Sequence, residues 1–263
     1  MELTGRTVLL TGATGGIGHA IARALHARGA ALLLTGRRTE VLAPLAEELG
    51  ATSLAADLAQ RSDVERLVAE AGHADVLVNN AALPGSGPVL SFSVDEIDRA
   101  IEVNLRAPMI LARHFGETMS ERGSGHLVFV SSLSGKTAQA GSAVYSATKF
   151  GLRGFVQGLR GDLAPAGVGV SAVFPGFIRD AGMFHESGTV LPKGVGTSTP
   201  EDVAAGVVRV IERNRMELDV APLPMRVMAS FAAAAPATAA KLAARMGGDE
   251  VASQMAKGQA DKR

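Results

Sequence analysis

Tyr145 and Lys149 are the residues whose types and spacing best suit acid–base chemistry in this chain. Tyr145 is the only tyrosine of the sequence, and Lys149 follows four residues later in a stretch that reads as a helix. Positions i and i+4 lie one above the other on a helix, so the ammonium can approach the phenol. A nearby positive charge lowers the pKa of a phenol, and such a phenol can exchange a proton with an alcohol or a carbonyl oxygen. Taken alone, the pair is more simply a chance match on a helix face.

Composition narrows the function classes. A chain of 263 residues fits one large α/β domain, and its 26 basic and 26 acidic residues leave no net field that would attract nucleic acid. The absence of cysteine excludes disulfides and thiolate chemistry, and the histidines show no metal-ligand spacing, so we predict no metal site. The N-terminus lacks a basic region followed by a long apolar run, so we expect a cytoplasmic protein.

A glycine-rich turn joins the first predicted strand to the first predicted helix. The aliphatic run Arg6–Thr11 is followed by Gly12-Ala-Thr-Gly-Gly-Ile-Gly18, and residues 17–28 then repeat with helical spacing. Glycines here let backbone N–H groups approach a pyrophosphate in front of the positive end of the helix dipole. A lone glycine pattern is also typical of an ordinary turn, but its position between strand and helix favours dinucleotide binding.

The end of the second predicted strand, Ala31–Thr35, indicates which dinucleotide binds. An acidic residue at this point usually meets a free ribose 2′-hydroxyl, whereas a 2′-phosphate needs positive charge. The sequence has Gly36, Arg37 and Arg38 here, which favours NADP(H) over NAD(H). The alternative is that both arginines are solvated surface residues before the next helix.

Strands and helices alternate along the remaining chain without hairpin signals, which predicts a doubly wound parallel sheet of about seven strands with helices on both faces. The later strands are expected at Thr52–Ala56, Asp75–Asn79, Gly125–Val130, Val168–Phe174 and Leu218–Ala221. Ligands of such sheets lie at the carboxyl ends of the strands, so Asp57 and the stretch Asn79–Ala82 are candidates to line a nucleotide site. Each could instead form a local turn.

With these motifs in order, the chain resembles the short-chain dehydrogenase/reductase family, in its compact single-domain branch. Thr11 and the glycines that follow match the family's cofactor turn, Asp57 matches its adenine-contacting aspartate, and Asn79-Asn80-Ala81-Ala82 is similar to its Asn-Asn-Ala-Gly signature, with alanine in place of the final glycine. The resemblance extends over about residues 4–180.

The resemblance implies four catalytic residues. Ser132 stands thirteen residues before Tyr145, the family's usual separation, and is expected to hydrogen-bond the substrate oxygen; Ser131 is the weaker choice. Lys149 is expected to lower the pKa of Tyr145 and to bind the cofactor ribose. Asn104, in a helix expected over Val94–Glu121, is expected to bend that helix and hold Lys149 through a water.

The resemblance also implies the cofactor site. Pro175-Gly176 resembles the turn near the nicotinamide, where the family often has threonine four residues after the glycine and this chain has Asp180. The predicted cofactor-binding residues are Gly12, Thr14, Gly15, Gly16, Ile17, Gly18, Arg37, Arg38, Asp57, Leu58, Asn79, Asn80, Ala81, Tyr145, Lys149, Pro175, Gly176 and Ile178.

The last third of the chain is the variable part. We expect 1–263 to form one domain in which residues 181–199 are a substrate lid loop and residues 223–263 a helical C-terminal extension. Pro200 begins a predicted helix to about Arg213. Val227–Ala240 is uncharged and interrupted by proline, which predicts two packed helices rather than a membrane span of ~20 residues. The polar end, Gln254–Arg263, is expected to fray.

The predicted function is an NADP(H)-dependent oxidoreductase that interconverts a secondary alcohol and a ketone on a small molecule, with Tyr145 as general acid or base. Two alternatives stay open: a 3-ketoacyl-thioester reductase of lipid metabolism, and a nucleotide-sensing binding protein with little turnover. The resemblance further implies a homodimer or homotetramer, formed through the helices at Val94–Glu121 and Ser142–Leu163.

Overall fold

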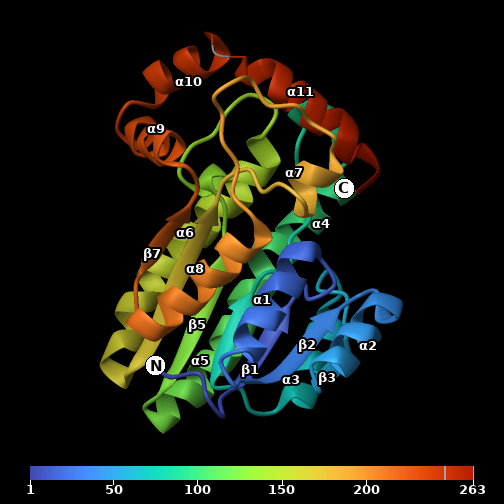
Figure 1. Ribbon diagram of the computed structural model, residues 1–263, viewed down its shortest axis with the longest axis vertical. Coiled ribbons are helices and arrows are strands. Elements are labelled where there is room, and N and C mark those ends of the chain that lie inside the picture. The colour runs from blue at the N-terminus through green and yellow to red at the C-terminus, as the bar shows by residue number, and fades with distance from the viewer. Residues whose placement is uncertain (246, 263) are drawn as a thin grey trace.

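A seven-stranded parallel sheet organises the protein in the computed structural model, which describes residues 1–245 and 247–262 (Figure 1). The sheet has the order β3-β2-β1-β4-β5-β6-β7, so the chain winds outward from β1 first in one direction and then in the other. This confirms the predicted doubly wound architecture. The strands are β1 (Thr7–Thr11), β2 (Ala31–Gly36), β3 (Thr52–Ala55), β4 (Val76–Asn79), β5 (Gly125–Val130), β6 (Val168–Pro175) and β7 (Glu217–Val220).

Helices cover both faces of the sheet because successive strand residues point to opposite faces. Val8 of β1 belongs to one apolar core and Leu9 to the other, and both are fully buried. The first core packs against α1 (Gly16–His26), α2 (Thr39–Glu48) and α8 (Pro200–Arg213). The second core packs against α3 (Arg61–Ala71), α5 (Ala107–Arg122) and α6 (Ala143–Leu163).

The helix expected over Val94–Glu121 is interrupted in the structure. It begins with α4 (Val94–Ile101), in which Ser93 and Glu96 form a reciprocal capping box, and continues through a π-helical turn at Glu102–Arg106 into α5. The π turn contains Asn104, at the position where the family resemblance implied a bend. Such turns release backbone groups from the regular ladder and redirect a side chain.

Three helices form an arch beyond the carboxyl ends of the strands, at the end of the molecule opposite the N-terminus (Figure 1). They are α9 (Leu223–Ala234), α10 (Pro236–Arg245) and α11 (Gly248–Gln259), and the short α7 (Gly182–Glu186) lies beside α11. The expectation that the chain frays from Gln254 is wrong for residues 254–262, because α11 continues to Gln259 and packs against α7. Arg263 lies outside the described residues. Within the described ranges no helix has the length and apolarity needed to cross a membrane.

Candidate active site

A cavity of about 1230 Å³ lies at the carboxyl ends of the strands and is also lined by α7, α9 and α11. Parallel sheets bind ligands at this edge because the loops that follow the strands converge there. Eighteen of the twenty predicted site residues line this one cavity, and Asn79 and Asn104 do not. Those that line it are Gly12, Thr14, Gly15, Gly16, Ile17, Gly18, Arg37, Arg38, Asp57, Leu58, Asn80, Ala81, Ser132, Tyr145, Lys149, Pro175, Gly176 and Ile178.

The glycine turn between β1 and α1 has no room for side chains at two positions. Gly12 has a φ of +67°, and a Cβ there would lie 2.7 Å from the Cα of Ala81. A Cβ on Gly18 would lie 2.2 Å from the carbonyl oxygen of Gly12. Glycine at both positions lets the turn fold tightly, and the start of α1 lines the cavity at Gly15 and Gly16, where a pyrophosphate at a helix N-terminus would lie.

The rim next to β2 is basic. Arg38 donates a hydrogen bond to the carbonyl oxygen of Thr14 at 2.6 Å, and Arg37 lies 3.9 Å from the carboxylate of Asp57 with half of its side chain exposed. A Cβ on Gly36 would lie 2.6 Å from the Cγ2 of Thr14, so an acidic residue fits at position 36 only if Thr14 moves. The rim can therefore present guanidinium groups to an anionic substituent on a bound ribose.

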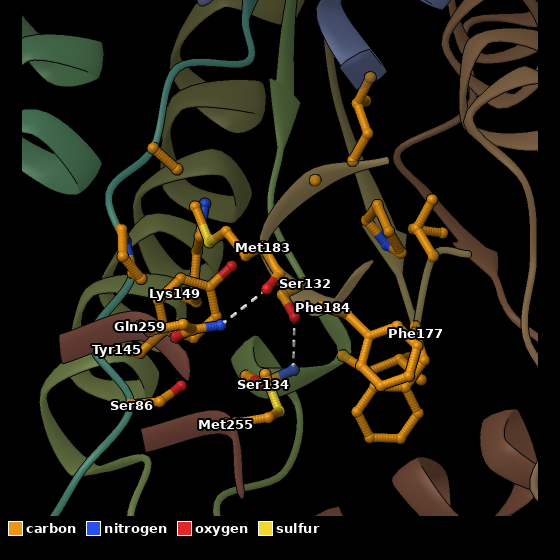
Figure 2. Close-up of a pocket in the computed structure, with 18 of the residues that line it drawn as sticks. Ser86, Ser132, Ser134, Tyr145, Lys149, Phe177, Met183, Phe184, Met255 and Gln259 are labelled. Atoms are coloured by element: carbon orange, nitrogen blue, oxygen red, sulfur yellow. Dashed lines mark hydrogen bonds between the residues drawn. The ribbon is translucent and has the colours of Figure 1, made fainter. Parts of the chain in front are cut away.

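Three of the predicted catalytic residues line the cavity together (Figure 2). Ser132 follows the end of β5, and Tyr145 and Lys149 lie in α6. The Ser132 hydroxyl accepts a hydrogen bond from the backbone N–H of Ser134 at 3.1 Å, which fixes its place. Lys149 is 1% exposed, and its Nζ donates to the carbonyl oxygen of Val130 at 3.2 Å and lies 5.5 Å from the centre of the Tyr145 ring. Tyr145 keeps part of its surface open to the cavity.

The expected direction of the Tyr145 pKa shift is wrong in this structure. Burial raises the pKa of Tyr145 to about 12, and the hydrogen bond with Ser132 offsets only part of that rise. Burial also lowers the pKa of Lys149 to about 8, since the surrounding protein penalises its charged form. The spacing of four residues brings Lys149 near the ring of Tyr145, yet burial is the largest cause of the pKa shift of each group.

Two predicted asparagines lie behind the cavity wall. Asn104 is 1% exposed, and its amide exchanges hydrogen bonds with the backbone of Leu83 at 2.7 and 2.9 Å and reaches Thr148 at 3.4 Å. The side chain of Asn79 is 3% exposed and finds no hydrogen-bond partner within the described residues. Asn80 lines the cavity, but its amide donates to the carbonyl oxygens of Thr11 and Gly12 and so supports the glycine turn.

Sequence reasoning missed several residues of the cavity. Arg99 of α4 lies 3.8 Å from Asp57, and the ring centre of Phe177 lies 4.9 Å from that of Phe184 in the predicted 181–199 lid, with the two planes tilted by 46°. Gln259 reaches the cavity from the last turn of α11. A single arginine on a helix or a glutamine near a terminus looks like surface, so no local signal marks these residues. Asp180 has a φ of +68° and an exposed carboxylate that pairs with Arg179, and it is absent from the cavity wall.

Comparison with known proteins identifies the family. The family model described as short chain dehydrogenase matches residues 6–190. Ketoacyl reductase HetN from Nostoc sp. is 38% identical over 232 residues, covering 85% of this chain and 81% of the relative. A short-chain dehydrogenase from Sphingobium yanoikuyae in complex with NADPH superposes with a TM-score of 0.76 at 28% identity, covering 83% of this chain and 88% of that one. The closed form of serine dehydrogenase complexed with NADP⁺ gives 0.74 at 31% identity, covering 83% and 95%. This chain therefore belongs to the short-chain dehydrogenase family and is an oxidoreductase.

Proposed function

We propose that this oxidoreductase uses NADP(H) to interconvert a secondary alcohol and a ketone. The observation that carries the proposal is the convergence of Ser132, Tyr145 and Lys149 on the cavity that also receives the glycine turn. The cofactor is supported by the tight glycine turn at Gly12 and Gly18, where a Cβ would clash with the backbone, and by the basic rim beside it. Two structures similar to this one contain NADPH or NADP⁺.

In the reductive direction the side chains would hold and protonate the carbonyl oxygen. Bound NADPH supplies the hydride that reaches the carbonyl carbon. A phenol whose pKa is about 12 carries its proton at neutral pH. Tyr145 can therefore donate this proton to the carbonyl oxygen of the substrate as that oxygen gains negative charge. Ser132 lines the same cavity and would position the carbonyl oxygen of the substrate. The positive charge of Lys149 favours the phenolate that Tyr145 becomes when it gives up its proton.

The segment 181–199 is proposed to act as a lid over the substrate. It contains α7, and Met183, Phe184 and Leu191 of this segment face the cavity. These side chains offer an apolar surface, which suits a hydrophobic ketone better than a sugar. The naming of one relative as a ketoacyl reductase keeps an acyl thioester as the second candidate substrate class.

Cofactor binding is the first test. We expect nicotinamide fluorescence to report tighter binding of NADPH than of NADH by the purified protein. Arg37→Asp should weaken NADPH binding selectively, whereas the matched charge change Arg61→Asp, on α3 outside the cavity, should not. Equal binding of both nucleotides would contradict the NADP(H) assignment.

Turnover is the second test. Oxidation of NADPH is measured with a panel of 2-ketones and a 3-ketoacyl thioester of N-acetylcysteamine. Tyr145→Phe should keep NADPH affinity and lose activity by at least ~100-fold, because it removes the proton donor. Activity that survives this change would remove Tyr145 from the reaction. NADPH binding without turnover of any carbonyl compound would favour a nucleotide-sensing protein.

A further inference from the structure

The wall of the cavity contributed by the C-terminal helices is almost wholly apolar. The side chains that α7, α9 and α11 direct to it include Met183, Met228, Val251 and Met255. Glu186 and Gln259 are the polar residues that these helices bring to the cavity, and the exposed Asp261 and Lys262 line it from the turn after α11. Glu186 is 47% exposed and pairs with Lys262, so it belongs to the rim.

Gln259 is the buried exception, with 2% of its surface exposed. Its Nε2 donates a hydrogen bond to the carbonyl oxygen of Met183 at 3.0 Å, and Figure 2 shows it among the residues around the cavity with Ser132 and Tyr145. Because a carbonyl oxygen only accepts, this contact fixes which end of the amide is nitrogen. The other end, Oε1, has no hydrogen-bond partner in the part of the chain that the structure describes.

The backbone around Gln259 is held in place by α7 and the residues after it. A Cβ on Gly258 would lie 2.1 Å from the carbonyl oxygen of Ser187, so the helix and this segment touch backbone to backbone. Before Gln259 in the same helix, Gln254 accepts a hydrogen bond from the N–H of Val190 at 2.9 Å. In the turn that follows the helix, Lys262 pairs with Glu186. These contacts hold Gln259, and with it the unpartnered Oε1, in a fixed position.

We propose that Gln259 determines substrate specificity, and that its Oε1 accepts a hydrogen bond from a hydroxyl or amide N–H carried by an otherwise apolar ketone or alcohol. This inference rests on the proposed carbonyl reduction. A buried acceptor without a partner costs free energy, so a ligand that supplies a donor at this point is favoured over one that does not. The substrate class is thus a hydrophobic carbonyl compound with a second, hydrogen-donating group away from the reacting carbon.

The test compares two series of ketones. Plain 2-ketones from 2-hexanone to 2-dodecanone are each paired with the ketone of equal length that carries a terminal hydroxyl. For the wild-type protein with NADPH, kcat/KM should favour the hydroxylated ketone by about 10-fold at one chain length, where the hydroxyl reaches Oε1, and should disfavour it at the others. Gln259→Met keeps the volume of the side chain and removes the acceptor, and it should bring the ratio at that chain length to that of the neighbouring lengths.

Gln254→Ala is the matched control, because Gln254 also holds the 181–199 segment from α11 but does not line the cavity. It should change kcat/KM for both series alike and keep their ratio. Loss of the preference in Gln254→Ala as well as in Gln259→Met would mean that Gln259 only fastens α7, which overturns the proposal. Plain ketones reduced without a hydroxyl preference at any length would overturn it too and leave carbonyl reduction standing. Reduction of no ketone in either series would overturn both.

Discussion

Replacing Lys149 by methionine should stabilise the folded protein near neutral pH while removing its activity. Lys149 is 1% exposed, and burial lowers its pKa from 10.5 to about 8. Each unit of pKa shift corresponds to 1.36 kcal/mol, so keeping the ammonium charged inside the fold costs about 3 kcal/mol. Methionine has a similar length and carries no charge, and it therefore escapes this cost.

The sign of the pH dependence follows from proton binding. Between about pH 8 and pH 10.5 the unfolded chain binds more protons at position 149 than the folded one, so the stability of the wild type rises with pH. Below that window Lys149 is charged in both states, and the full cost is present. The stability advantage of Lys149→Met should therefore shrink by about 3 kcal/mol between pH 7 and pH 10.5.

Urea unfolding followed by far-ultraviolet circular dichroism is the suitable assay, because the chain has no tryptophan and one tyrosine. The assay compares the difference in the free energy of unfolding between the two proteins at pH 7 with the same difference at pH 10.5. Packing changes at position 149 alter this free energy equally at both pH values, so they cancel in the comparison. Lys257→Met removes an exposed lysine instead, so its effect should be small at either pH. A Lys149→Met advantage that stays the same at pH 7 and pH 10.5 would refute the reasoning.

Two further predictions concern stability and the glycine turn. Burial opposes ionisation of Glu217, but hydrogen bonds from Arg153, Lys136 and Gln157 outweigh it and lower its pKa to about 2. Glu217→Gln should cost about 3 kcal/mol at pH 7, and urea unfolding should show this difference fading as pH falls from 4.5 toward 2; an undiminished difference at pH 3 would contradict it. Gly18→Ala should lower the free energy of unfolding by ~1–3 kcal/mol and weaken NADPH binding, because its Cβ would meet the Gly12 carbonyl at 2.2 Å. Gly15→Ala, whose Cβ would have its nearest contact at 3.7 Å, is the control in thermal unfolding, and equal effects of both changes would refute the steric argument.

The amino-acid sequence alone predicted the parallel sheet and eighteen residues of the cavity wall. Aliphatic runs such as Arg6–Thr11, the glycine turn after them and the helical repeat that follows are local patterns, and each acts within a few residues. Their order along the chain then determines the winding of the sheet, since connections between parallel strands have one favoured hand. The strand boundaries differ from the prediction by at most one residue at either end, because hydrogen bonding with the neighbouring strand decides where a strand ends.

Tertiary structure decided the electrostatics of the site and the shape of its far wall. Helical spacing predicted that Tyr145 and Lys149 lie close together, but only the packing around both residues showed that burial is the largest cause of the pKa shift of each. Asn79 looked like a ligand-binding residue and lies behind the wall, whereas Gln259 looked like a frayed end and is buried next to Met183, 76 residues away in the sequence. Burial and long-range hydrogen bonds depend on which surfaces meet after folding, and no local pattern of residue types carries that information.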